Sequence, residues 1–167
     1  MAGPELRDYL AQPVRRRPPV HTCSVYHFTR EGYELLERDT ADSFNVRCGS
    51  SSPGETYAAV SNYVFGSWQA SGKLMGLAPY GSAERYGPSL LEQDSAGHLR
   101  FSSAWKLNER QPSGRLDPMQ HRDLAARIQA DFETAVLQRV DAALELAKGS
   151  PLVFTGGLAL NSCLNEK

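Results

Sequence analysis

A pair of glycines near the carboxyl end of the chain has the composition of a phosphate-binding turn. Gly156 and Gly157 separate a predicted strand at residues 152–155 from a predicted helix at residues 158–166. A bound phosphate needs backbone N–H donors that no side chain obstructs, and two glycines ahead of a helix supply them. The alternative is a tight turn that needs glycine only for its backbone angles. The spacing matches neither the Rossmann motif nor the P-loop, which disfavours both classes.

Four more positions could contribute to the same ligand. Asn161 follows Gly157 by about one helical turn, where its amide could bind a ribose or a base. Residues 72–81 read GKLMGLAPYG, and their three glycines and one proline predict a loop with at most a helical turn at LMGLA. In this segment Lys73, between Gly72 and Gly76, could neutralise a phosphate. The alternative is a solvent-exposed lysine beside structural glycines.

The sequence predicts no metal site and singles out no catalytic residue, so the catalytic residues stay unknown. Its four histidines contain no H-x-x-x-H pair, and the three cysteines are widely spaced without C-x-x-C. Cys163 is expected to be a small buried residue rather than a nucleophile. This cysteine usage favours a reducing, cytoplasmic location.

The elements that must position these residues can be predicted from spacing and caps. Residues 22–28 and 33–37 form a predicted hairpin, and residues 90–98 contain a second one. A helix is predicted to begin at Pro53 after the cap Ser52. Its buried face is predicted to comprise Tyr57, Val60, Ser61, Val64 and Trp68.

The most regular pattern follows Asp117, which precedes a proline and is predicted to cap a helix. Apolar residues then recur every three or four positions and predict an amphipathic helix of about thirty residues. Gly149 is its predicted end. Residues 1–19, rich in proline and arginine, are predicted to be a tail, and residues 20–167 a domain with an exposed connection at 104–116.

Composition limits the partners that can be expected. The chain has 167 residues, of which 41% are hydrophobic, and 18 basic against 19 acidic residues give a formal charge of −1. This balance gives no electrostatic argument for nucleic acid or for an anionic membrane as the main partner. No apolar run approaches the length of a membrane-spanning helix.

Two segments taken together resemble a known family. SSPGETYAAVSNYVFG followed by SGKLMGLAPYG is similar to the signature of NodU/CmcH-type O-carbamoyltransferases, and LVFTGGLALNSCLNEK is similar to their GGxALN nucleotide loop. The helical segment between them, DLAARIQADFETAVLQRVDAAL, matches the family in pattern and position. The resemblance covers roughly residues 22–167 and rests on two distinct motifs in the same order.

The resemblance implies an α/β fold, a partial lobe of the ASKHA (actin-like ATPase) fold with a mixed sheet, antiparallel hairpins and packed helices. Family members use ATP and carbamoyl phosphate to make carbamoyl-adenylate, and then transfer the carbamoyl group to a hydroxyl of a natural product. By this resemblance Gly156 and Gly157 would face nucleotide phosphates and Asn161 the nucleoside. Lys73 and the glycines beside it would line the same cleft.

The resemblance also implies parts that this sequence does not contain. The family's metal-binding histidines are expected upstream of residue 22, and the aspartate of that metal site is expected beyond Lys167, together with the domain that makes carbamoyl-adenylate. Ser71 stands where family members often carry glutamate. We therefore expect the middle of a carbamoyltransferase, incomplete alone, that needs a partner chain or a longer parent and could self-associate. The alternatives are a non-catalytic docking module and a remnant with a new active site.

Overall fold

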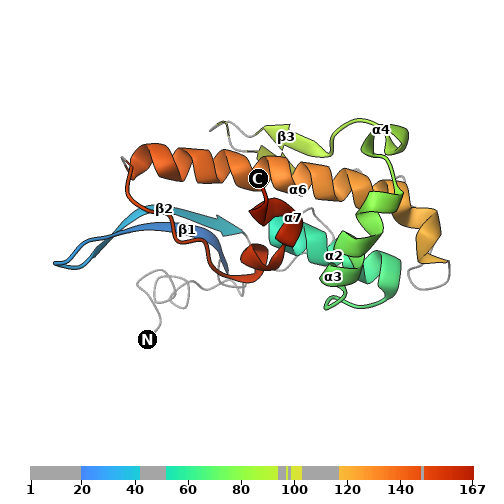
Figure 1. The fold of residues 1–167 in the computed structure, drawn as a ribbon, viewed down its shortest axis with the longest axis horizontal. Coiled ribbons are helices and arrows are strands. Elements are labelled where there is room, and N and C mark those ends of the chain that lie inside the picture. The colour runs from blue at the N-terminus through green and yellow to red at the C-terminus, as the bar shows by residue number, and fades with distance from the viewer. Residues whose placement is uncertain (1–19, 42–51, 94–96, 98, 103–116, 148) are drawn as a thin grey trace, which may run out of the picture. The chain divides into compact units, whose positions relative to one another are not determined.

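The computed structural model describes residues 20–41, 52–93, 97, 99–102, 117–147 and 149–167. They divide into two compact units, one within Met1–Val46 and one within Arg47–Lys167. The fold is mixed α/β, with helices and two small antiparallel two-stranded sheets (Figure 1). The predicted tail at 1–19 and the predicted connection at 104–116 lie outside the described residues.

The first unit contains the predicted amino-terminal hairpin, which is confirmed. Strands β1 (Val20–Phe28) and β2 (Tyr33–Ala41) pair antiparallel, with Phe28 opposite Tyr33 beside the turn. The Thr29 N–H donates to the Gly32 carbonyl at 2.8 Å and closes this turn. The rings of Tyr26, Phe28 and Tyr33 contact one another on this hairpin, with centroids 5.7–6.2 Å apart.

The second unit begins with helix α2 (Pro53–Phe65), and its start agrees with the predicted cap. The Ser52 hydroxyl accepts from the Glu55 N–H at 3.4 Å. The helix ends before Gly66, whose φ of 69° belongs to the left-handed region that favours glycine. Because the chain leaves the helix there, Trp68 is exposed and the prediction that it continues the buried face is wrong.

The glycine-rich segment at 72–81 is mostly helical, which corrects the predicted loop. Helix α3 (Ser71–Leu77) continues directly into a 3-10 turn, η1 (Ala78–Tyr80), and α4 (Ala83–Tyr86) follows after Gly81. Leu74 and Leu77 are buried in the core. Burial of these two leucines is worth roughly 1.5–3 kcal/mol each and outweighs the low helix propensity of the glycines.

Strands β3 (Leu91–Gln93) and β4 (Leu99–Phe101) form the predicted second hairpin. The predicted long helix begins with a 3-10 turn, η2 (Pro118–His121), and continues as α6 (Arg122–Leu146). Asp117 caps this start, since its carboxylate accepts from the Met119 N–H at 3.0 Å. Helix α6 is the long helix in Figure 1, and α2, α3, α4 and β4 all contact it.

The apolar face of α6 is the centre of the core. Its predicted stripe is mostly confirmed, because Leu124, Ile128, Phe132, Val136 and Ala143 are buried, while Val140 is half-buried. Residues of α2 and α3 cover it, among them Val60, Val64 and Leu74. The helix ends at Leu146, slightly before the predicted end at Gly149.

The segment after α6 differs from the predicted strand and helix. Residues 151–155 form no strand in the part of the chain that the structure describes, and Leu152, Val153 and Phe154 are largely exposed. The predicted single helix is divided into a 3-10 turn, η3 (Gly157–Leu160), and a short helix, α7 (Ser162–Asn165). A strand needs a neighbouring strand to complete its hydrogen bonds, and the β-forming residues do not supply one by themselves.

Candidate functional site

The candidate site is the turn formed by Gly156 and Gly157, which lies at the surface. Both glycines are exposed, and a Cβ added at either position would meet nothing within 4 Å. Gly156 has a φ of 100° and therefore requires glycine, whereas Gly157 opens η3 in a conformation that other residues adopt. The turn thus has the open backbone that an anion would need, but no strand leads into it.

The two segments that carry the sequence motifs come together in space. The Ser162 hydroxyl, at the start of α7, donates to the Met75 sulfur of α3 at 3.6 Å. In η3, Leu158 lies against Gly54 in the first turn of α2, where an added Cβ would be only 2.7 Å from the leucine Cδ2. The carboxyl-terminal segment therefore contacts α3 through Ser162 and α2 through Leu158.

The residues predicted on α3 lie on its exposed surface. Gly72, Lys73 and Gly76 are all exposed, and neither glycine has a neighbour within 4 Å of an added Cβ. The Lys73 backbone N–H donates to Ala70 at 2.9 Å, which belongs to the start of the helix. Lys73 is therefore a helical surface lysine and not a loop residue, and its contact with a phosphate stays a prediction.

Asn161 is held inside the protein by its own amide. Its Nδ2 donates to Gln129 Oε1 at 3.1 Å, and its Oδ1 accepts from Gln129 Nε2 at the same distance. The same Oδ1 accepts from the Leu164 N–H at 3.0 Å and so caps α7. Both side chains are buried. A contact between Asn161 and a nucleoside, which stays a prediction, would require these bonds to be exchanged.

The network extends from Gln129 to two more residues. The Tyr57 hydroxyl donates to Gln129 Oε1 at 2.7 Å, and Gln129 Nε2 donates to Glu133 at 2.7 Å. Burial, with smaller contributions from Cys163 and Glu133, raises the pKa of the Tyr57 hydroxyl above its ordinary value. The hydroxyl is consequently a protonated donor at every physiological pH.

Sequence reasoning missed this network because its members lie far apart along the chain. Tyr57 was predicted only as an apolar face residue, and Gln129 was not singled out. The available signal was a glutamine beside Ile128 in the most apolar part of the long helix. A buried amide needs partners, so its position predicts a polar contact, although not the identity of the partner.

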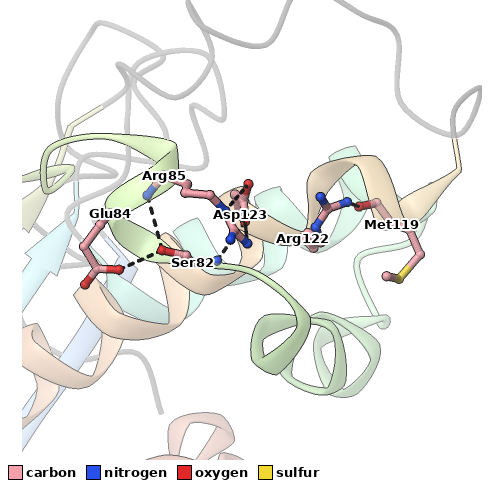
Figure 2. A network of polar contacts seen from close by, with 6 residues as sticks. All are labelled: Ser82, Glu84, Arg85, Met119, Arg122 and Asp123. Atoms are coloured by element: carbon pink, nitrogen blue, oxygen red, sulfur yellow. Dashed lines mark hydrogen bonds and ion pairs between the residues drawn. The ribbon is translucent and has the colours of Figure 1, made fainter.

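A second polar cluster fixes α4 to the start of α6. Figure 2 shows Ser82 and Arg85 converging on the carboxylate of Asp123. The Ser82 N–H donates to Asp123 at 2.7 Å, and the Arg85 guanidinium contacts the same carboxylate at 3.0 Å. Hydrogen bonds from Arg85 and then from Ser82 lower the pKa of Asp123 below its ordinary value. Because Ser82, Arg85 and Asp123 are bonded to one another, we assign this cluster a structural role.

We expect this cluster to make stability depend on pH. Because the folded-state pKa of Asp123 is depressed, its contribution is present above the unfolded pKa of about 4 and is lost as pH falls through the folded pKa. Asp123→Asn keeps the acceptor for Ser82 but removes the charge. Urea unfolding at pH 7 and near pH 3 should show the parent slightly more stable than the variant at pH 7 and a smaller difference near pH 3. If the parent and the variant differed by the same free energy of unfolding at both pH values, the lowered pKa of Asp123 would be contradicted.

Among the described residues, no group of three or more His, Cys, Asp or Glu side chains is placed to hold a metal ion. In the same part of the chain, no helix has both the length and the apolar character needed to cross a membrane. No known family model matches the chain. No curated protein matches it either.

Proposed function

We propose that the chain is a nucleotide-binding part of a carbamoyltransferase-like protein with an ASKHA-type fold, and that it binds ATP at the Gly156–Gly157 turn. The observation that carries the proposal is that the two motif segments, 87 positions apart at Met75 and Ser162, are in contact. Two motifs of one ligand site must meet in space, whereas unrelated segments need not. The transfer of a carbamoyl group to a hydroxyl would require residues from another chain or from a longer parent.

The glycine turn fits the phosphate end of a nucleotide. Its backbone is exposed at Gly156 and Gly157, and no side chain stands within 4 Å of either added Cβ. The open space is what an anion needs in order to reach main-chain N–H groups. The exposed ammonium of Lys73 belongs to the same motif set and supplies a positive charge that a phosphate would attract.

A docking module without catalytic activity is the second candidate. It is favoured by Asn161, whose amide is engaged with Gln129 and Leu164 instead of being open to a nucleoside. It is also favoured by the exposed apolar side chains beside the turn, Val153 and Leu160, which are 84% and 82% exposed. Exposed apolar surface of this kind marks interaction sites.

Gly157→Val tests the first candidate. The new side chain enters open space at a backbone conformation that valine can adopt, so the fold should be unchanged. It would obstruct a bound phosphate, and we expect the dissociation constant for Mg-ATP to rise by about tenfold or more, the equivalent of one lost charge-assisted hydrogen bond. Isothermal titration calorimetry measures the affinity, and circular dichroism checks the fold.

Ala142→Val, at an exposed position of α6, is the matched control and should bind Mg-ATP as the parent does. Equal affinity of Gly157→Val and the parent would remove the glycine turn from the site. If the parent itself shows neither heat nor a thermal shift with Mg-ATP, the docking module becomes the better reading of the fold.

A further inference from the structure

The amide of Gln129 has every hydrogen-bonding position occupied. Its oxygen accepts from Tyr57 and from Asn161, and its nitrogen donates to Glu133 and to Asn161, at distances between 2.7 and 3.1 Å. An amide has two donor hydrogens and two acceptor lone pairs, so this side chain is saturated. The Gln129 residue that makes these four bonds is buried.

The outer partners leave the amide only one orientation. The Glu133 carboxylate can only accept and must face the amide nitrogen, which leaves the amide oxygen to accept from the Tyr57 hydroxyl. Turning the amide over would place its oxygen against the Glu133 carboxylate and break that bond. The orientation of Gln129 therefore fixes that of Asn161, whose Nδ2 faces the Gln129 oxygen and whose Oδ1 faces the Gln129 nitrogen and also caps α7.

Asn161 connects the amide pair to the glycine turn through the backbone. Only three residues separate it from Gly157, and its N–H donates to the Leu158 carbonyl at 3.1 Å. The Ala159 N–H donates to the Gly156 carbonyl at 3.2 Å, which continues the same chain of contacts to the turn. Hydrogen bonds and the short chain segment 158–161 thus connect Gln129 to the carbonyl of Gly156.

We propose that Gln129 is a positioning residue, which sets the geometry of the Gly156–Gly157 turn for an incoming nucleotide phosphate through its amide pair with Asn161. The inference rests on the proposed function of this turn. Gln129 is buried on α6 and acts through Asn161, not on the ligand. The result is a surface turn without a supporting strand that is nevertheless held in one conformation.

The competing explanation is that the amide pair only stabilises the core. The chain offers a matched control on the same helix, because Gln138 also joins α6 to another segment. Its oxygen accepts from the Leu99 N–H at 3.1 Å and its nitrogen donates to the Gly97 carbonyl at 3.3 Å. Gln129→Leu and Gln138→Leu remove the same chemical group from one helix, but only the first acts on the glycine turn.

The experiment measures Mg-ATP affinity and backbone amide NMR spectra of the parent and both variants, well below their melting temperatures. We expect both variants to melt at lower temperature, since each removes the hydrogen bonds by which a glutamine joins α6 to another segment. Only Gln129→Leu should weaken Mg-ATP binding, by about tenfold, and shift the Gly156 and Gly157 amide signals of the free protein. Asn161→Asp, which keeps the cap on Leu164 but loses the donor to Gln129, should act in the same direction if Gln129→Leu does not fold.

The outcomes separate the two proposals. A parent that does not bind Mg-ATP contradicts the proposed function and, with it, the role toward a nucleotide, while the NMR comparison still decides whether Gln129 positions the turn. Unchanged glycine signals in Gln129→Leu and Asn161→Asp, or an equal loss of affinity in Gln138→Leu, would overturn the assignment.

Discussion

Replacing Phe132 by alanine is expected to lower the free energy of unfolding by about 3–5 kcal/mol. Phe132 is 2% exposed at the centre of α6, where it belongs to the main core cluster. Its ring lies against Tyr57 of α2, with centroids 5.0 Å apart. Alanine would leave a cavity between the two helices and remove this aromatic contact, and a close-packed core can collapse only partly into such a space.

Urea unfolding followed by circular dichroism measures this loss. Leu144→Ala is the matched control, because Leu144 lies on the same helix and is 40% exposed. It should change the free energy of unfolding by no more than about 0.5 kcal/mol, as is usual for surface substitutions. A loss below about 1 kcal/mol for Phe132→Ala would mean that α2 and α6 do not pack as described.

The elements that the sequence predicts well are those with both a cap and a periodic apolar face. Ser52 and Asp117 each accept a backbone N–H at the helix start that they were predicted to cap. The stripe from Leu124 to Phe132 is buried as its spacing requires. These signals are local, because a cap acts within three residues and a helical face repeats every 3.6 residues.

Elements that depend on distant partners could not be predicted in this way. The apolar residues Leu152 and Val153 favour a strand, but strand formation requires a neighbour that residue types do not identify. In the glycine-rich segment the opposite occurred, since burial of Leu74 and Leu77 against the core made a helix from residues of low helix propensity. Contacts with residues distant in the sequence therefore determined the secondary structure of both segments.

The candidate site also combines a local feature that the sequence predicts with distant contacts that it does not predict. A turn at Gly156 was predicted from residue type, and its φ of 100° is a conformation that needs glycine, as the conformational alternative also requires. The phosphate contact stays a prediction. The amide pair of Gln129 and Asn161 joins residues 32 positions apart, and no spacing rule connects them. Asp131 is a similar case, since its buried carboxylate accepts from the Leu90 N–H at 2.7 Å, 41 positions away. Hydrogen bonds between elements that are distant in the sequence can be identified only when the positions of those elements are known.

Two glycines of one ten-residue segment should respond to alanine in opposite directions. Gly81 lies against the first turn of α6, where an added Cβ would overlap the backbone carbonyl of Arg122. Backbone on both sides is held, because the Ser82 N–H that follows Gly81 is bound to Asp123, the residue after Arg122. Neither side can move without breaking the cluster in Figure 2. We therefore expect Gly81→Ala to lower the free energy of unfolding by about 3 kcal/mol, the upper part of the usual range for overpacking.

Gly76, in α3, has open space around its missing Cβ and a helical backbone. Gly76→Ala should raise the free energy of unfolding by about 0.5–1 kcal/mol, because alanine favours the helix that glycine weakens. Thermal and urea unfolding of the two variants and the parent measure both effects. The opposite signs follow from the space around each missing Cβ, which the backbone of Arg122 fills at Gly81 and which is open at Gly76. If Gly81→Ala proved as stable as the parent, that close approach to Arg122 would be absent in the folded protein.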